Sequence, residues 1–267
     1  QLTIVIITYK RYPFLKRLLK FFESYQSGAR FLVLDSSPEF PEDTELKELL
    51  GRDHVTWKRF DSATFFAYKI SVGCKHIETD YAVLSADDDF LIPTALRACV
   101  YFLAEYPDYA SAHGLYFNHI RDVKARNNLF RIEPIYDQGL SSEEKTGAER
   151  VQAYLEGQTG YYPIFAVHRA STFRLIWNET AEYVTDWGLS ELFPSSLSFA
   201  YGKMKILPAF YASRELNNFG WYDEKRHLEM YSEEKLVRAV KGLGKHLSKV
   251  ESLSLVEAER LVGDAFD

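Results

Sequence analysis

The stretch from Tyr81 to Pro93 constrains the fold more than any other part of the chain. An apolar run, YAVLSA, ends in three consecutive aspartates, Asp87, Asp88 and Asp89, and a proline follows four residues later. Adjacent like charges repel, and each is costly to bury without a counter-charge. Open α/β sheets place their ligands at the carboxyl ends of the strands. We therefore predict a buried strand whose end binds a divalent cation carrying a phosphorylated ligand; the alternative is a solvated acidic turn before a helix.

The segments before this stretch alternate between strand and helix patterns. A run rich in β-branched residues covers 2–8, a second strand pattern covers 31–35, a third covers 55–60, and a helix with one apolar face follows Pro13. Continuous apolar runs are typical of strands buried on both faces of a parallel sheet. The pattern predicts an α/β protein with a doubly wound, mostly parallel sheet flanked by helices.

Weaker patterns complete the expected element order. Helices are predicted at 42–50, 64–77, 93–106, 143–156, 170–177, 187–200, 232–247 and 253–266. Strands are predicted at 110–119, 161–168 and 204–211, and a polar loop or hairpin at 121–139. Pro163 interrupts one of these strands, which predicts an edge or a bend there.

Composition narrows the class of protein. A chain of 267 residues that is 46% hydrophobic can bury the core of one large domain. A formal net charge of -6 argues against a nucleic-acid partner. Cys74 and Cys99 both fall in predicted helices, which indicates buried thiols in a reducing, cytoplasmic compartment. No apolar run reaches the roughly 18 residues of a transmembrane helix.

Polar residues also follow the first two predicted strands. Thr8, Lys10 and Arg11 end the first, and Asp35 with Ser37 ends the second. The first loop has no Gly-x-Gly-x-x-Gly, and the chain has no Gly-x-x-x-x-Gly-Lys-Ser/Thr, so dinucleotide and P-loop folds are not indicated. Asp35 can still accept from a base or ribose, and the two basic residues can meet phosphate oxygens or serve as surface charge.

Three segments, 3–11, 34–37 and 84–93, resemble GT-A glycosyltransferases of the family-2 type. The resemblance covers about the first 110 residues. It implies a nucleotide, usually uridine, and Mn²⁺ or Mg²⁺ held by Asp87 and Asp89, although the spacing leaves open which two of the three aspartates bind the metal. The residues implied to contact the nucleotide sugar are Thr8, Tyr9, Lys10, Arg11, Asp35, Ser37, Lys69, Asp87 and Asp88.

The second half resembles this family more loosely. Tyr183-Val-Thr-Asp-Trp-Gly-Leu-Ser-Glu-Leu192 is similar to the segment that carries the general base, which implies Asp186 as the base with Glu191 as the second choice. The alternative role for Asp186 is a helix cap. His227 is the implied third metal ligand, and its alternative is an ordinary structural or surface histidine.

The expected function is therefore a metal-dependent, inverting glycosyltransferase. It would move a sugar from a nucleotide sugar, such as a UDP-sugar, to a saccharide or lipid-linked acceptor. A sugar-phosphate nucleotidyltransferase and a non-catalytic saccharide-binding module are the alternatives. The expected organisation is a domain over 1–225, divided at 110 into nucleotide-binding and acceptor halves, and an appendage over 226–267. Basic residues of the appendage allow peripheral membrane docking, or simply a solvated face.

Overall fold

The computed structural model describes residues 1–121, 130–134, 141–159, 163–215 and 232–266. The elements of the first half are β1 (Leu2–Thr8), α1 (Tyr12–Ser24), β2 (Arg30–Asp35), α2 (Thr44–Leu50), β3 (Val55–Arg59), α3 (Phe66–Gly73), a 3-10 turn (Cys74–His76), β4 (Tyr81–Ala86), β5 (Asp89–Leu91) and α4 (Pro93–Glu105). Those of the second half are β6 (Tyr109–Arg121), β7 (Phe130–Pro134), α5 (Gly147–Leu155), a 3-10 turn (Pro163–Phe165), β8 (Val167–Arg169), α6 (Ala170–Tyr183), α7 (Leu192–Tyr201), β9 (Lys203–Glu215), α9 (Glu233–Glu251) and α10 (Leu255–Asp264).

The strands of the described residues form one nine-stranded sheet, in the order β3-β2-β1-β4-β8-β6-β9-β5, with β7 also paired to β6. The four strands from β3 to β4 are all parallel. Beyond β4 the pairing is mixed: β8 is antiparallel to both neighbours, β6 and β9 run parallel, and β5 returns antiparallel to β9. The expected α/β class is confirmed, and the purely parallel part of the sheet is its N-terminal half.

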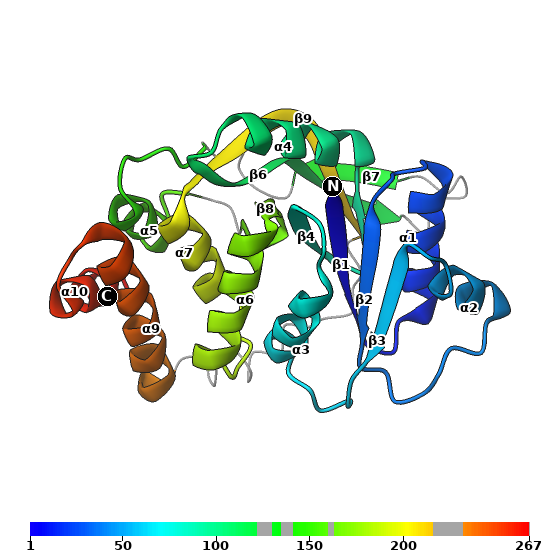
Figure 1. Ribbon diagram of the computed structural model, residues 1–267, viewed down its shortest axis with the longest axis horizontal. Helices are drawn as coiled ribbons and strands as arrows, with labels where there is room; N and C mark the ends of the chain where they lie inside the picture. Colours follow the sequence, from blue (N-terminus) through cyan, green and yellow to red (C-terminus); the bar gives the residue numbers. More distant parts are fainter. Residues whose placement is uncertain (122–129, 135–140, 160–162, 216–231, 267) are drawn as a thin grey trace.

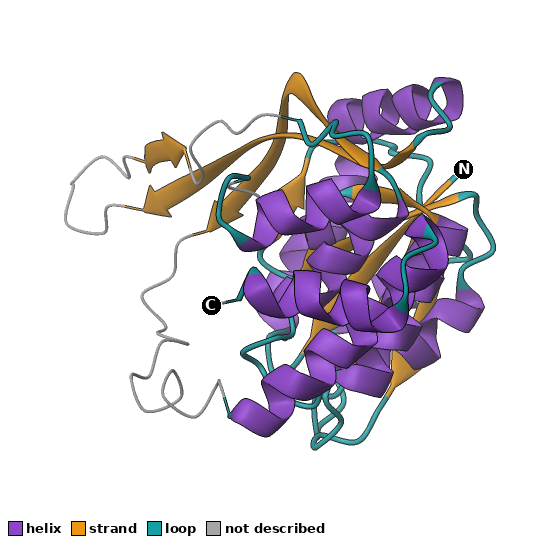
Figure 2. Ribbon diagram, turned by 90° about the vertical axis from the view of Figure 1, so that its left-hand side faces the viewer, coloured by secondary structure: helices purple, strands orange, loops and turns teal. Residues whose placement is uncertain are grey.

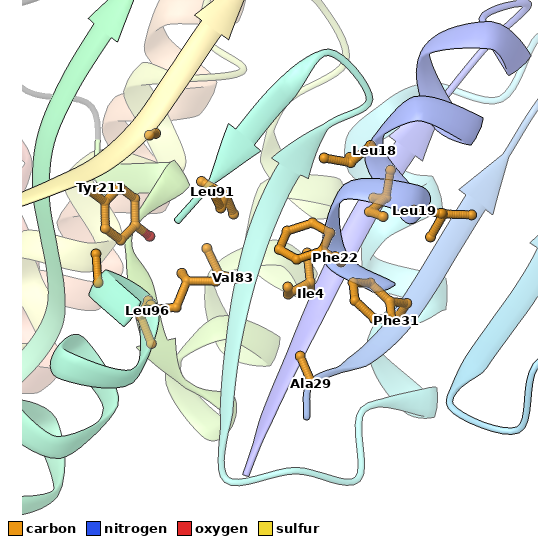
Figure 3. Packing of buried hydrophobic residues seen from close by; sticks show 14 of the residues in the cluster. Ile4, Leu18, Leu19, Phe22, Ala29, Phe31, Val83, Leu91, Leu96 and Tyr211 are labelled. Carbon is orange, nitrogen blue, oxygen red and sulfur yellow. The ribbon is translucent and has the colours of Figure 1, made fainter. Parts of the chain in front are cut away.

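Side chains of the parallel strands alternate between two hydrophobic clusters, one on each face of the sheet. Ile4 and Ile6 pack on one face with residues of α1, α2 and α4, and Figure 3 shows Phe22 of α1 against Ile4 and Phe31. Val5 packs on the other face with α3 and α6. Strands covered on both faces explain why the sequence shows unbroken apolar runs here.

A third cluster holds the C-terminal helices against the rest of the molecule. It joins residues of α5, α6, α7, α9 and α10. Of these, α5, α7, α9 and α10 lie toward the end of the molecule opposite α1 and α2, and α6 lies between them and α3 (Figure 1). A Cβ added at Gly242 of α9 would lie 2.7 Å from Tyr183 and 3.0 Å from Phe193, so this helix packs directly on α6 and α7. The expected division at 225 falls among residues outside the described ranges.

Several expected boundaries were wrong, and each has a local cause. Of the strand expected over 161–168, positions 161 and 162 lie outside the described ranges, and the strand of the described part covers only Val167–Arg169. Pro163 instead begins a 3-10 turn, because it lacks the N–H that a strand ladder uses. The helix expected from 143 begins at Gly147, because Thr146 and Glu149 form a reciprocal capping box. The helix expected over 170–177 continues to Tyr183. The region 121–139 contributes β7 to a hairpin with β6, one of the two forms expected.

Figure 2 shows that the β6–β7 hairpin extends away from the helical body of the molecule. None of the helices in the described part of the chain combines the length and apolar character that crossing a bilayer requires. Both cysteines, Cys74 and Cys99, are free and buried, as expected.

Candidate active site

The three consecutive aspartates lie where a buried strand ends, as the sequence predicts. β4 pairs in parallel with β1 and is the last strand of the parallel part of the sheet, and it ends at Ala86. Asp87 and Asp88 form a turn, and Asp89 is the first residue of β5. We call Asp87–Asp89 the acidic turn. Pairing of β5 with β9 fixes the far side of this turn, a constraint that the sequence did not indicate.

Arg11 and Thr8, from the end of β1 and the loop after it, contact the first two aspartates. Arg11 Nε lies 3.0 Å from Asp87 Oδ1, and Arg11 Nη2 forms an ion pair with Asp88. Thr8 Oγ1 donates a hydrogen bond of 2.7 Å to Asp87 Oδ2. Burial nevertheless raises the pKa of Asp87 to about 7; Arg11 and Thr8 lower it, and Asp88 and Asp89 raise it further. The fold therefore holds this carboxylate at a cost in electrostatic free energy.

Asp89 has a different partner. Arg214 of β9 stands opposite it in the antiparallel ladder, and the guanidinium Nε and Nη2 lie 3.2 Å from Asp89 Oδ1 and Oδ2 respectively. Burial raises the pKa of Asp89, and Arg214 opposes that shift. The sequence analysis did not single out Arg214. The two residues are 125 positions apart and meet only through the strand pairing, so no local pattern could have found the contact.

Glu191, the second choice for the general base, lies within electrostatic range of Asp89 and Arg214. It occupies the N-cap position of α7. The residue as a whole is solvent-exposed. The protein atoms around its carboxyl group nevertheless desolvate that group, which raises its pKa. Arg214 lowers the pKa and Asp89 raises it, so both groups lie close enough to act on Glu191.

Asp186, the first choice for the base, serves a turn in this structure. Its Oδ1 accepts hydrogen bonds from the backbone N–H groups of Gly188 at 2.9 Å and Leu189 at 3.4 Å. Lys235 of α9 lies 4.0 Å from its other oxygen. This Asx-type turn delays the helix expected from 187, which begins only at Leu192. Asp186, which the sequence suggested as a helix cap, therefore caps the 186–189 turn and not helix α7.

Asp35, at the end of β2, is fully buried and bonded to protein donors. Oδ2 accepts from Tyr12 Oη at 2.9 Å and from Trp57 Nε1 at 3.2 Å, and Oδ1 accepts from the backbone N–H of Ser37 at 2.8 Å. Arg59 lies 3.9 Å from Oδ2. Asp35 therefore organises a cluster that the sequence analysis did not foresee, instead of offering a free carboxylate to a ligand.

An exposed ring and a guanidinium form the outer layer of that cluster. Phe40 is 69% exposed, and its ring lies 4.1 Å from the guanidinium carbon of Arg59 and meets Trp57 edge-on. An exposed aromatic ring beside a guanidinium can stack on a heteroaromatic ring. The sequence signal for it is weak, because Phe40 and Trp57 also fit ordinary core packing.

The loop after β1 lies beside this cluster and carries the other predicted ligand-binding residues. Tyr9 is exposed, and Lys10 adopts φ 56°, a left-handed conformation that side-chain-bearing residues rarely accept. The backbone N–H of Lys10 donates to Ser37 Oγ at 2.8 Å, which ties this loop to the end of β2. Strained backbone held by a specific contact is common at functional sites.

Lys69 of α3 lies buried beneath the ends of β1 and β2. Its Nζ donates to the backbone oxygen of Thr8 at 3.3 Å and to Ser36 Oγ at 3.0 Å. Burial lowers its pKa to about 8, while Asp35 and Asp87 oppose the shift. The ammonium group of Lys69 thus supports the ends of β1 and β2 from beneath. Any contact between Lys69 and a diphosphate would come from below the loop that follows β1.

A metal ion fits this site only together with a ligand that supplies further oxygens. Within the described residues, no three His, Cys, Asp or Glu side chains gather into a cluster that could hold a metal. The predicted third ligand, His227, lies outside them. Mg²⁺ and similar hard cations are commonly bound by one or two carboxylates plus substrate phosphates. Asp88 is the most exposed of the three, at 16% of its side chain against 5% for both neighbours, and so offers the accessible carboxylate.

No model of a known protein family matches the sequence, and no curated protein matches it either. Solved structures do match, and they place the chain in the GT-A type of α/β fold. One is S. aureus TarS 1–349 in complex with UDP, with a TM-score of 0.53 and 12% identity over 99% of this chain and 70% of that one. TarS 1–349 in complex with UDP-GlcNAc has a TM-score of 0.50 and 10% identity over 100% of this chain and 89% of that one.

A longer TarS structure matches with a TM-score of 0.50 and 13% identity over 100% of this chain. The match covers 54% of that TarS chain, so the present chain spans about half of its length. The expected GT-A fold is thus confirmed by comparison of structures, at sequence identities of 10% to 13%.

Proposed function

We propose that this protein is a metal-dependent, inverting glycosyltransferase that uses a nucleotide sugar, in the first instance a UDP-sugar, and a saccharide or lipid-linked acceptor. One observation carries the proposal. An acidic turn lies at the end of β4, and Asp89 of this turn acts electrostatically on a further carboxyl group, that of Glu191. The fold around that arrangement is shared with structures of TarS in complex with UDP and with UDP-GlcNAc.

The nucleoside would lie over the surface formed by Phe40, Trp57 and Arg59. Asp35 holds this surface in place through Trp57 and Tyr12, so its role is to position the nucleoside site rather than to bind the base itself. The loop at Tyr9 and Lys10 then reaches toward the phosphates. This assignment puts the nucleotide across the ends of β1, β2 and β3, where parallel sheets of this kind bind ligands.

The diphosphate would lie at the acidic turn. Asp88, with Asp87 beside it, would hold Mn²⁺ or Mg²⁺, and Arg214 would keep Asp89 in place. The bound ion supplies positive charge to the departing diphosphate. Arg11 and Lys69 add fixed positive charge on the same side, which also favours the developing negative charge.

The transfer itself needs one base. The acceptor oxygen attacks the anomeric carbon, the bond from that carbon to the diphosphate oxygen breaks, and the acceptor's hydroxyl proton passes to Glu191. The raised pKa of Glu191 makes it a better proton acceptor than an ordinary glutamate. Asp186 remains the other candidate, although its Oδ1 is bonded to the 186–189 turn.

The membrane contact expected for the C-terminal helices stays a prediction. Three of the basic side chains that suggested it contact protein neighbours. Lys235 lies near Asp186, Arg238 donates to the backbone oxygen of Glu182, and Lys245 lies near Glu179. A cytoplasmic location also stays a prediction.

Incubating the protein with a panel of nucleotide sugars, with Mn²⁺ and with a chelator, tests the proposal. We expect slow release of nucleoside diphosphate from one UDP-sugar, dependent on Mn²⁺, and faster release with a suitable saccharide. Release of pyrophosphate from a nucleoside triphosphate and a sugar phosphate would instead indicate a nucleotidyltransferase. Saccharide binding without any turnover would indicate a binding module.

A further inference from the structure

Arg11 occupies the oxygens that a metal ion would need. Its Nε lies 3.0 Å from Asp87 Oδ1, and its Nη2 pairs with Asp88, the most accessible carboxylate of the acidic turn. Thr8 holds the other oxygen of Asp87, and Arg214 takes both oxygens of Asp89. A divalent cation that approached this structure alone would meet a guanidinium already in place.

Electrostatics makes that competition substantial. Like charges at contact distance repel more strongly inside a protein than in water, and the repulsion between Arg11 and a divalent ion is larger than that between two single charges at the same distance. A nucleoside diphosphate changes the balance, because its phosphate oxygens offer partners to both cations. The guanidinium can then leave the carboxylates for the phosphates, and the metal can take its place.

The two arginines differ in their freedom to do this. Arg214 is anchored on β9 and grips Asp89 through two nitrogens across a strand ladder. Arg11 lies at the N-cap position of α1, outside the strands, and divides its guanidinium between Asp87 and Asp88. Both arginines are partly exposed, and the guanidinium of each lies over an aromatic ring. The difference is that Arg11 is not held in a strand ladder, so its side chain can shift between carboxylate and phosphate without moving the backbone.

We propose that Arg11 acts as a built-in counter-ion that keeps the acidic turn closed to metal until a nucleoside diphosphate arrives, so that metal binding depends on the nucleotide. The inference rests on the proposed function for the identity of the two ligands. It adds the order in which they bind. Binding of one ligand must strengthen binding of the other by an equal factor, because the coupling is reciprocal.

Titration with MnCl₂ alone, followed by calorimetry or by the electron paramagnetic resonance of free Mn²⁺, tests this directly. The variant Arg11→Gln removes the guanidinium, and we expect it to bind Mn²⁺ without nucleotide at least about tenfold more tightly than the wild type. Arg17→Gln is the matched control. Arg17 is on the same helix and pairs with Glu215, so its loss changes the local charge by the same amount without freeing the acidic turn. We expect a change of less than about threefold for it.

A second readout covers loss of stability in Arg11→Gln. Without the guanidinium, the adjacent carboxylates repel one another, so Arg11→Gln should melt at a lower temperature than the wild type. Added MnCl₂ should restore the melting temperature of the variant and leave that of the wild type unchanged. The variant Arg11→Lys keeps the positive charge but lacks the forked guanidinium. Its melting temperature should fall between those of Arg11→Gln and the wild type.

The outcome separates this inference from the proposed function. If Arg11→Gln binds Mn²⁺ alone no more tightly than Arg17→Gln, Arg11 does not guard the acidic turn. If it binds Mn²⁺ more tightly but UDP has no effect on Mn²⁺ affinity in the wild type, Arg11 does exclude the metal, but release by a nucleotide is overturned and the nucleotide-sugar function fails with it. Tighter Mn²⁺ binding together with a smaller coupling between Mn²⁺ and UDP in Arg11→Gln supports both.

Discussion

Two buried polar clusters of this protein are built on opposite plans. In the acidic turn, three like charges are adjacent, and burial raises the pKa values of Asp87 and Asp89 despite the nearby arginines. At the other end of the molecule, His246 of α9 lies between two hydrogen-bonding partners, one at each ring nitrogen. Tyr201 Oη lies 2.6 Å from its Nδ1, and Glu179 Oε2 lies 2.9 Å from its Nε2.

The contrast separates groups retained for chemistry from groups retained for the fold. In the helical cluster each donor meets an acceptor, and the contacts join α9 to α6 and α7. Such networks stabilise when they are fully satisfied. In the acidic turn the arrangement concentrates charge that the fold does not need. Changes in the first cluster should therefore affect stability, and changes in the second should affect activity.

The largest effect is expected for Asp88→Asn. Loss of the accessible carboxylate should lower metal-dependent release of nucleoside diphosphate by roughly 10³-fold, because the metal contributes several kcal/mol to stabilisation of the leaving group. The melting temperature should stay within a few degrees of the wild type. Asp80→Asn, at the exposed start of the same strand, should leave activity unchanged. Equal losses of activity in the two variants, or a large drop in the melting temperature of Asp88→Asn, would contradict the proposed difference between the acidic turn and the helical cluster.

Glu191→Gln should lower transfer by about 10²-fold or more, because the proton of the acceptor hydroxyl then has no base. Affinity for UDP with Mn²⁺ should be retained. Asp186→Asn is the comparison, and we expect it to keep most of the activity because its Oδ1 supports the 186–189 turn. The reverse ranking of the two variants would make Asp186 the base.

His246→Gln should lower the free energy of unfolding by about 2 kcal/mol, since it leaves a buried partner unsatisfied. Activity per folded molecule should be preserved, as measured by denaturant unfolding alongside turnover. His54→Gln, at an exposed histidine, should change stability by less than about 0.5 kcal/mol. A turnover defect larger than the stability defect in His246→Gln would show that the helical cluster serves chemistry too.

A smaller effect concerns pH. His168 and His113 are buried, and burial lowers the pKa of each to about 4 from the usual 6.5. The unfolded chain therefore binds more protons than the folded one between those values, and stability falls as pH decreases through this window. Each histidine should contribute a loss of about 2 kcal/mol between pH 7 and pH 5.

The variant His168→Gln isolates that contribution from the carboxylates. The difference in unfolding free energy between wild type and variant should shrink by about 2 kcal/mol over the same range, measured by urea unfolding at each pH. Parallel curves would mean that His168 is not held neutral by burial.

The sequence was most informative where local pattern and tertiary environment agree. Apolar runs at 2–8 and 31–35 became β1 and β2 because both faces of those strands are covered. The triple aspartate was placed correctly because a strand end fixes its position. The helix at 187–200 was misplaced because the side chain of Asp186 satisfies backbone donors in a turn.

The missed residues share one property: their roles come from contacts between distant segments. Arg214 meets Asp89 through the β5–β9 pairing, and Trp57 meets Asp35 across neighbouring strands. Arg11 was assigned to phosphate but pairs with the acidic turn in this structure. Charge pairing of this kind depends on topology, which one sequence does not specify residue by residue.

The most direct test is calorimetry of UDP binding with and without Mn²⁺, in the wild type and in a variant with all three aspartates of the acidic turn changed to asparagine. The account predicts that Mn²⁺ strengthens UDP binding by at least about tenfold in the wild type and has no effect in the variant. Equal UDP affinity with and without the metal in both proteins would contradict it.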